Sequence, residues 1–102
     1  AVGIMGLSRD GSVKGRHKAI LWGMWVRPSH RRRGVGRLLV GHGLEFLRRE
    51  TDIEQVLLSV VTGNVGAAAL YESLGFRTYG LEPRALKTGS TYADERHMVL
   101  LL

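Results

Sequence analysis

The sequence predicts an α/β (α+β) domain in which a mixed central sheet is flanked by two helices. The first indication is an apolar run at 17–26, followed by an amphipathic helical pattern at 34–49 and a β-branched run at 53–62. Two strands joined by a helix form a right-handed parallel unit. The other indications are a second helical pattern within 63–76 and a final pair of strand-like segments. With 44% hydrophobic and 24% charged residues, residues 1–102 are expected to form a single domain.

The first two expected strands differ in their patterns. Residues 2–9 carry apolar side chains among small ones, which is typical of a strand. Residues 17–26 are almost continuously apolar, which predicts a strand buried on both faces. Gly23, in the middle of this run, indicates a bulge, a close approach of a ligand to the backbone, or room for Trp22 or Trp25.

The segment after this run has the chemistry of an anion site. Pro28 ends the strand, because it lacks a backbone N–H and disfavours a helical residue before it. Gly34 and Gly36 have no Cβ, so a ligand oxygen can approach converging backbone N–H groups. A helix start also offers unpaired N–H groups and partial positive charge, which favour phosphate. Fixed positive charge comes from Arg27, Arg31, Arg32, Arg33 and Arg37.

Two phosphate motifs are excluded here, and two plainer interpretations stay open. A dinucleotide-binding fingerprint needs a third glycine where Leu39 stands. No Gly-Lys-Ser/Thr sequence follows, which excludes a nucleoside triphosphate loop. A run of three arginines is most often part of a solvated loop. The net charge of +6, from 15 Lys and Arg against 9 Asp and Glu, also allows nucleic-acid binding by counterion release.

The second informative stretch is the helical pattern within 63–76. Asn64 is a favourable N-cap and Gly75 a favourable left-handed stop. Ala67 and Tyr71 lie on one face of this helix. On pattern alone, Tyr71 is more typical of a core or interface aromatic than of a catalytic group.

The C-terminal part is expected to contain the last two strands. Residues 76–80 and 91–102 have strand patterns, and Pro83 and Gly89 mark 81–90 as a loop between them. Charged side chains in this region are candidate proton acceptors or amine contacts, although each is more typical of a solvated surface charge. These candidates are Glu82, Asp94, Glu95 and His97.

Two motifs lie in order on either side of one expected strand. Residues 31–36 read Arg-Arg-Arg-Gly-Val-Gly, and residues 64–76 read Asn-Val-Gly-Ala-Ala-Ala-Leu-Tyr-Glu-Ser-Leu-Gly-Phe. They match the patterns Gln/Arg-x-x-Gly-x-Gly/Ala and Asn-x-x-Ala-x-x-Leu-Tyr-x-x-x-Gly-Phe. In both motifs the sequence resembles the GNAT superfamily of acetyl-CoA-dependent N-acetyltransferases. The resemblance implies an acyl-CoA N-acyltransferase fold, a mixed central sheet with a splayed parallel strand pair and two flanking helices.

The resemblance implies a binding site for acetyl-CoA. The glycine loop and helix start would hold the pyrophosphate. The end of the preceding strand would bond the pantetheine arm through its backbone, as an added strand does. The cofactor-binding residues implied in this way are Met24, Trp25, Val26, Arg31, Arg32, Arg33, Gly34, Val35, Gly36, Arg37, Asn64 and Ala67.

The resemblance also implies direct attack of a primary amine on the acetyl carbonyl in a ternary complex. Tyr71 would act as general acid to the leaving thiolate, and a backbone N–H near Val26 would stabilise the oxyanion. The strand at 17–26 has no carboxylate, so no base is assigned. The acceptor, a small-molecule or peptide amine, is not specified by the sequence.

The sequence departs from the family pattern at its start, where the usual first strand and helices are absent. Residues 2–9 would therefore form an exposed sheet edge that favours a homodimer. Acetyl-CoA binding could survive while transfer is weak, so the first alternative is a cofactor-binding remnant with a regulatory or partner-binding role. The second alternative is a small basic nucleic-acid-binding module. It is less favoured because no aromatic residue that could stack on bases lies between Arg27 and Arg37.

The composition bears on the cellular compartment, on metal binding and on membrane partners. Without cysteine there is no disulfide framework and no thiolate nucleophile, which fits a cytoplasmic location. The four histidines are not at zinc-ligand spacings, so no metal is expected. No stretch approaches the about 18 apolar residues of a membrane span, so no membrane partner is expected.

Overall fold

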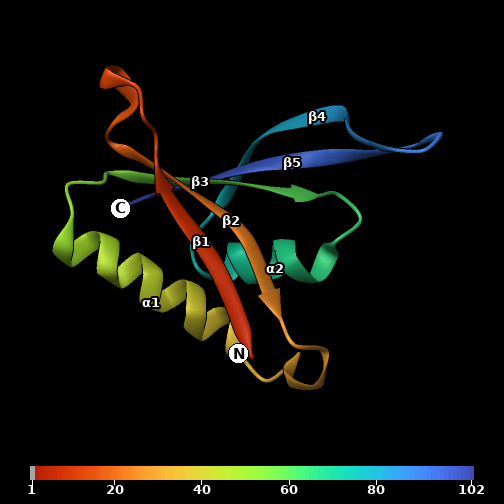
Figure 1. Ribbon diagram of the computed structural model, residues 1–102, viewed down its shortest axis with the longest axis horizontal. Helices are drawn as coiled ribbons and strands as arrows, with labels where there is room; N and C mark the ends of the chain where they lie inside the picture. Colours follow the sequence, from red (N-terminus) through yellow and green to blue (C-terminus); the bar gives the residue numbers. More distant parts are fainter. Residues whose placement is uncertain (1) are drawn as a thin grey trace.

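The computed structural model describes residues 2–102 as a five-stranded mixed sheet with two helices, in the strand order β1-β2-β3-β5-β4 (Figure 1). β2 and β3 run parallel, and every other neighbouring pair is antiparallel. The predicted fold class is confirmed. The elements are β1 (Gly3–Arg9), a 3-10 turn (Val13–Gly15), β2 (Lys18–Val26), a second 3-10 turn (Pro28–His30), α1 (Val35–Glu50), β3 (Gln55–Val61), α2 (Val65–Ser73), β4 (Arg77–Thr88) and β5 (Thr91–Leu101).

Both helices pack against the same face of the sheet. Buried side chains of α1 and α2 form one hydrophobic cluster with alternate residues of β2, β3 and β5, and Val40, Val56 and Met98 are the largest fully buried side chains. Successive strand residues point to opposite faces, so the intervening residues lie on a second face that neither helix covers. Within residues 2–102, no helix is long and apolar enough to cross a bilayer.

The prediction that residues 17–26 are buried on both faces is wrong. Leu21 of β2 points into the core and is 5% exposed. Ile20 and Trp22 point the other way and are 42% and 56% exposed. The reason is that α1 and α2 cover only one face, and an apolar run alone does not reveal how many faces are covered.

β2 and β3 are paired over only part of their length. The paired residues are Lys18 with Gln55, Ala19 with Val56, and Ile20 with Leu57. Beyond them the two strands diverge, as Figure 1 shows. Gly23 has a φ of 62°, and the β1–β2 register shifts beside it. Of the three interpretations left open for Gly23, the bulge is confirmed, and the splayed strand pair implied by the family resemblance is present.

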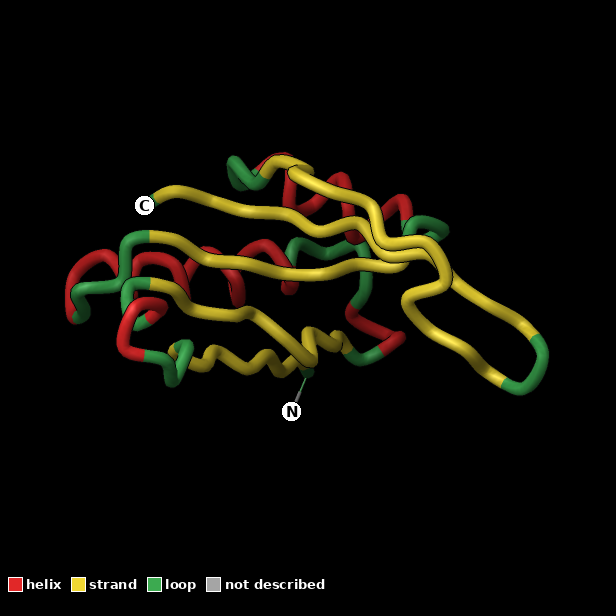
Figure 2. Tube along the Cα trace, turned by 90° about the horizontal axis from the view of Figure 1, so that it is seen from above, coloured by secondary structure: helices red, strands yellow, loops and turns green. Residues whose placement is uncertain are grey.

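The C-terminal hairpin is longer than the sequence predicts. Residues 81–88, expected as loop, continue β4 and pair with β5. The β4–β5 register shifts between Glu82 and Leu86, and Arg84 has a φ of 52°. Pro83 therefore lies at an irregularity of the strand, a position that tolerates the missing N–H. The hairpin extends beyond the rest of the domain (Figure 2).

Candidate functional site

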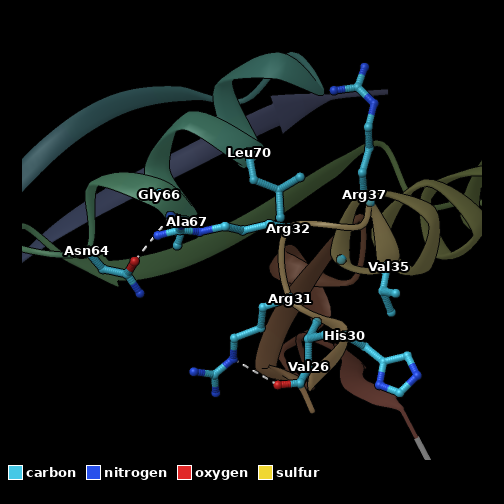
Figure 3. Close-up of a pocket in the computed structure, with 12 residues that line it drawn as sticks. Val26, His30, Arg31, Arg32, Val35, Arg37, Asn64, Gly66, Ala67 and Leu70 are labelled. Carbon is cyan, nitrogen blue, oxygen red and sulfur yellow. Dashed lines mark hydrogen bonds between the residues drawn. The ribbon is translucent and has the colours of Figure 1, made fainter. Parts of the chain in front are cut away.

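The start of α1 forms one wall of a cavity of about 470 Å³ (Figure 3). Gly34 caps α1 in the left-handed conformation, with a φ of 77°, and a Cβ added there would meet no other atom within 4 Å. The first N–H groups after Gly34 have no partner within the helix. These groups carry partial positive charge and belong to residues that line the cavity. The cavity is lined by Val26, His30, Arg31, Arg32, Gly34, Val35, Gly36, Arg37, Asn64, Gly66, Ala67 and Leu70.

Gly36 contributes to this cavity through packing. A Cβ at Gly36 would lie 3.0 Å from Met24 Cε and 3.2 Å from Leu70 Cδ2. The missing side chain therefore lets the first turn of α1 approach β2 and α2 closely. As a result, three elements that are distant in the sequence meet around the cavity.

Three arginines of the predicted anion site line the cavity. Arg31 donates from Nε to the carbonyl oxygen of Val26 at 3.0 Å. Arg37 donates from Nη1 to Ser73 Oγ at 2.6 Å, which joins α1 to α2. In Figure 3 the side chain of Arg32 extends towards the start of α2. The structure thus brings positive charge and a helix N-terminus to one cavity.

A second cavity, of about 260 Å³, lies between the splayed strands β2 and β3. Asn64 and Ala67 line both cavities, so the two adjoin at the start of α2. Asn64 Oδ1 accepts the N–H of Ala67 at 3.1 Å, which confirms the predicted N-cap. The second cavity is lined by Leu21, Trp22, Gly23, Met24, Leu58, Ser59, Val60, Val61, Asn64, Ala67, Tyr71 and Glu95.

Tyr71 combines a core position with access to the second cavity. Its ring meets Phe76 edge to face at 5.8 Å, and the residue is 5% exposed. Burial raises the pKa of the Tyr71 hydroxyl above its usual value of 10.0, so the hydroxyl stays protonated at neutral pH. Among the described residues this hydroxyl has no hydrogen-bond partner. The core interpretation of Tyr71 is confirmed, and its hydroxyl can donate to a bound molecule.

Glu82 and His97, which the sequence offered as candidate proton acceptors, belong to a chain of polar contacts across three strands, and sequence reasoning missed its third member, Ser59. Ser59 Oγ lies 2.8 Å from His97 Nδ1, and His97 Nε2 lies 2.9 Å from Glu82 Oε1. Ser59 and Glu95 both line the second cavity. Strand alternation could have placed Ser59 on the face opposite the core, but the register with β5 is needed to put it beside His97.

The remaining candidate residues lie elsewhere. Trp25 and Arg33 line neither cavity. Asp94 Oδ1 accepts the backbone N–H of Arg84 at 2.8 Å and so supports the hairpin. Within residues 2–102, one set of side chains, Glu82, Glu95 and His97, has possible ligand atoms within 4.8 Å of one another, a spacing that exposed acidic groups commonly show without an ion. That the protein needs no metal stays a prediction.

A comparison with known proteins decides the family. The model of the Acetyltransferase (GNAT) family matches residues 1–76, which include both motifs and both helices. This chain belongs to the GNAT acetyltransferase family. Residues 31–36 and 64–76, which carry the sequence resemblance, therefore lie at the two cavities of a GNAT domain.

Relatives of this GNAT chain include enzymes that modify proteins. It is 34% identical over 83 residues to the [ribosomal protein bS18]-alanine N-acetyltransferase of Salmonella typhimurium, covering 81% of this chain and 55% of the relative. A probable acetyltransferase from Staphylococcus epidermidis is 28% identical, with a TM-score of 0.88, covering 98% of this chain and 60% of that one. The fold is shared by yncA of Salmonella typhimurium, solved with its cofactor acetyl-CoA, at a TM-score of 0.91 and 22% identity, covering 99% and 58%. The GNAT chain thus spans less than two thirds of each of these proteins.

Proposed function

We propose that this chain binds acetyl-CoA and transfers the acetyl group to a primary amine by direct attack in a ternary complex. The observation that carries the proposal is the junction of two cavities at Asn64 and Ala67, one beside a positively charged helix start and one between splayed strands. A molecule with phosphates at one end and a thioester at the other matches this arrangement. Membership of the GNAT family supports the same reaction.

The cavity at the start of α1 fits a diphosphate. Its backbone N–H groups and helix dipole favour an anion, and the absent Cβ of Gly34 leaves space for oxygens to approach. Arg31 is held in place by its hydrogen bond to Val26, and a guanidinium group binds phosphate oxygens in pairs. The Arg37 side chain instead points away from the cavity, to Ser73 at the end of α2 (Figure 3), so Arg37 is proposed to contribute through its backbone. The sequence prediction for these residues is therefore retained as part of the proposal.

The splayed part of β2 fits an extended arm. Past Ile20 the backbone of β2 has no paired residue on β3, while β1 continues to pair with its other side. Backbone groups of residues 24–26 that point towards β3 can therefore bond a pantetheine arm as an added strand would. The thioester would then lie in the second cavity. Val26 lines only the first cavity, so the oxyanion donor expected near Val26 is proposed instead to be a backbone N–H of the part of β2 that lines the second.

Tyr71 is the proposed general acid. Its hydroxyl is protonated at neutral pH, lacks a partner among the described residues and belongs to a residue that lines the second cavity. A donor placed beside a departing thiolate lowers the barrier, typically by a rate factor of about 10² to 10⁴. Holding amine and thioester at attack distance supplies a further part of the acceleration.

A peptide N-terminal amine is the first acceptor to test. The relative from Salmonella typhimurium is named for acetylation of an alanine of a ribosomal protein. A peptide that begins with alanine therefore represents the acceptor class of that relative. We place this reaction in the cytoplasm, the compartment that the cysteine-free composition fits.

The proposal is tested by a thermal-shift titration with acetyl-CoA, followed by detection of free thiol in the presence of the alanine-initiated peptide. Saturable stabilisation should reach about 2.7 kcal/mol at a hundredfold excess over the dissociation constant. Thiol release that depends on the peptide supports the enzyme. Stabilisation without thiol release supports the regulatory remnant instead. If the protein binds random DNA in a salt-dependent way and coenzyme A does not reduce that binding, the result supports the nucleic-acid module and contradicts the proposal.

The edge of the sheet supports a prediction about assembly. β1 pairs with β2 on one side, and no described strand pairs with its other side. Unpaired N–H and C=O groups at an edge favour pairing with another chain. We expect light scattering to give twice the chain mass at high concentration, and Ile4→Lys, a charge on this edge, to return the protein to a monomer. A wild-type protein that stays monomeric contradicts the prediction.

A further inference from the structure

A chain of hydrogen bonds crosses the sheet on the face opposite the helices. It begins at Ser59 on β3, passes through the ring of His97 on β5 and ends at Glu82 on β4. Ser59 and His97 are direct partners in the β3–β5 register, so the backbone fixes their approach. The His97 side chain is 26% exposed, and its ring also lies 6.1 Å from the ring of Tyr79.

The partners of His97 define which ring nitrogen carries the proton. A carboxylate only accepts hydrogen bonds, so His97 Nε2 donates to Glu82 Oε1 at 2.9 Å. In the neutral ring, Nδ1 is then the acceptor, and it accepts the hydroxyl proton of Ser59 at 2.8 Å. The hydroxyl oxygen of Ser59 keeps its own lone pairs. Ser59 can therefore accept a proton at its oxygen while it passes its own proton to His97.

The chain of contacts reaches the second cavity at Ser59. Tyr71 and Glu95 line the same cavity, Tyr71 from α2 and Glu95 from β5. A proton donor and a path for removing a proton thus meet at one cavity. Glu82 and Glu95 each have a carboxylate oxygen within 4.8 Å of a ring nitrogen of His97.

We propose that Ser59 and His97 form a proton relay that deprotonates the attacking amine, with Glu82 as the residue that positions the ring. This inference deepens the proposed function and rests on it.

The relay balances the transfer step. Before attack, the protonated amine gives one proton to Ser59 Oγ, as the hydroxyl proton of Ser59 moves to His97 Nδ1, and His97 then releases a proton to solvent. The neutral amine nitrogen forms a bond to the acetyl carbon, and the carbon–sulfur bond breaks. Tyr71 gives its proton to the departing thiolate. The second proton that the nitrogen loses passes through solvent to the Tyr71 oxygen, which restores the hydroxyl.

The first test uses the free protein. Long-range ¹H–¹⁵N correlation spectra should show His97 as the Nε2–H tautomer in the wild type. Glu82→Gln should lose this preference, because an amide can donate as well as accept. A His97 that carries its proton on Nδ1 in the wild type overturns the relay, whether or not the protein is an enzyme.

The second test is kinetic, with acetyl-CoA and the alanine-initiated peptide. Ser59→Ala and His97→Gln should each lower kcat about 10²-fold at pH 7, while the KM for acetyl-CoA stays within about twofold. The defect should shrink by up to about tenfold at pH 9, because a peptide α-amine has a pKa of about 7.7–8.0 and is then neutral without help. A purely structural role would not make the defect depend on the state of the amine. His42→Gln is the matched control, since His42 is exposed on α1 and should leave kcat unchanged.

Other outcomes separate this inference from the proposed function. If His97→Gln turns over at the wild-type rate while Glu95→Gln is inactive, Glu95 is the proton acceptor. That result overturns the relay but not the proposed function. An acetyl group found on Ser59 by mass spectrometry makes Ser59 a nucleophile and also overturns it. A wild-type protein that binds acetyl-CoA but releases no thiol contradicts the proposed function, and the relay with it.

Discussion

Replacing Tyr71 with Phe is expected to lower kcat about 10²-fold or more, because the variant loses the proposed proton donor to the thiolate. The ring keeps its edge-to-face contact with Phe76, and the hydroxyl has no partner among the described residues, so folding should be little affected. Burial raises the pKa of Tyr71 above 10.0, so the protonated donor persists as pH rises. The midpoint of any loss of wild-type rate through ionisation of Tyr71 should therefore lie above pH 10. Thiol release measured across this range checks both expectations.

Tyr92→Phe provides the matched control for this experiment. Tyr92 lies in the β4–β5 hairpin beneath the guanidinium of Arg84, 4.7 Å from the ring centre, and lines neither cavity. Removing the Tyr92 hydroxyl should leave kcat unchanged. A Tyr71→Phe protein with the same kcat as Tyr92→Phe would remove Tyr71 from the proposed mechanism.

Replacing Gly34 with Asp is expected to raise the Kd for acetyl-CoA at least about tenfold, whereas Gly34→Asn should raise it only a few-fold. Asn and Asp have nearly the same size, and both tolerate the left-handed conformation of Gly34, with its φ of 77°, better than other side chains. They differ by one negative charge at the start of α1. That charge opposes phosphate oxygens in the cavity.

The same pair of variants should rank in the opposite order for stability. A carboxylate at a helix N-terminus interacts favourably with the helix dipole, by about 0.3–1 kcal/mol. Thermal unfolding without ligand should therefore find Gly34→Asp at least as stable as Gly34→Asn, while calorimetric titration finds it the weaker binder. Equal affinities for the two variants would mean that the diphosphate does not bind at the start of α1.

Local chemistry explains what the sequence could predict. Asn64 caps α2 through its own side chain, and Gly75 takes a φ of 101° just after it. Gly34 likewise takes a left-handed conformation at the start of α1. Each of these features depends on a residue and its neighbours within one turn. The start of α1 and the second helix could therefore be predicted from the sequence alone, whereas the anion site at the start of α1 stays a prediction.

Features that depend on pairing between distant segments could not be read in this way. Ser59 and His97 are 38 residues apart, and their contact exists only because β3 and β5 pair in one register. The open face of β2 depends on where both helices pack, which no single strand pattern contains. The continuation of β4 past Pro83 depends on irregular pairing with β5. Sequence patterns describe each segment alone, and these features belong to pairs of segments.

The uncovered face of β2 gives the protein an internal optical probe. The chain has two tryptophans, and both lie on β2, where Trp22 is 56% and Trp25 is 42% exposed. Trp22 also lines the cavity between the splayed strands. No deeply buried indole contributes a background signal, so water loss at this face should shift nearly the whole emission spectrum to shorter wavelength. Arrival of an acceptor peptide or a second subunit there could be followed by the fluorescence of the unlabelled chain.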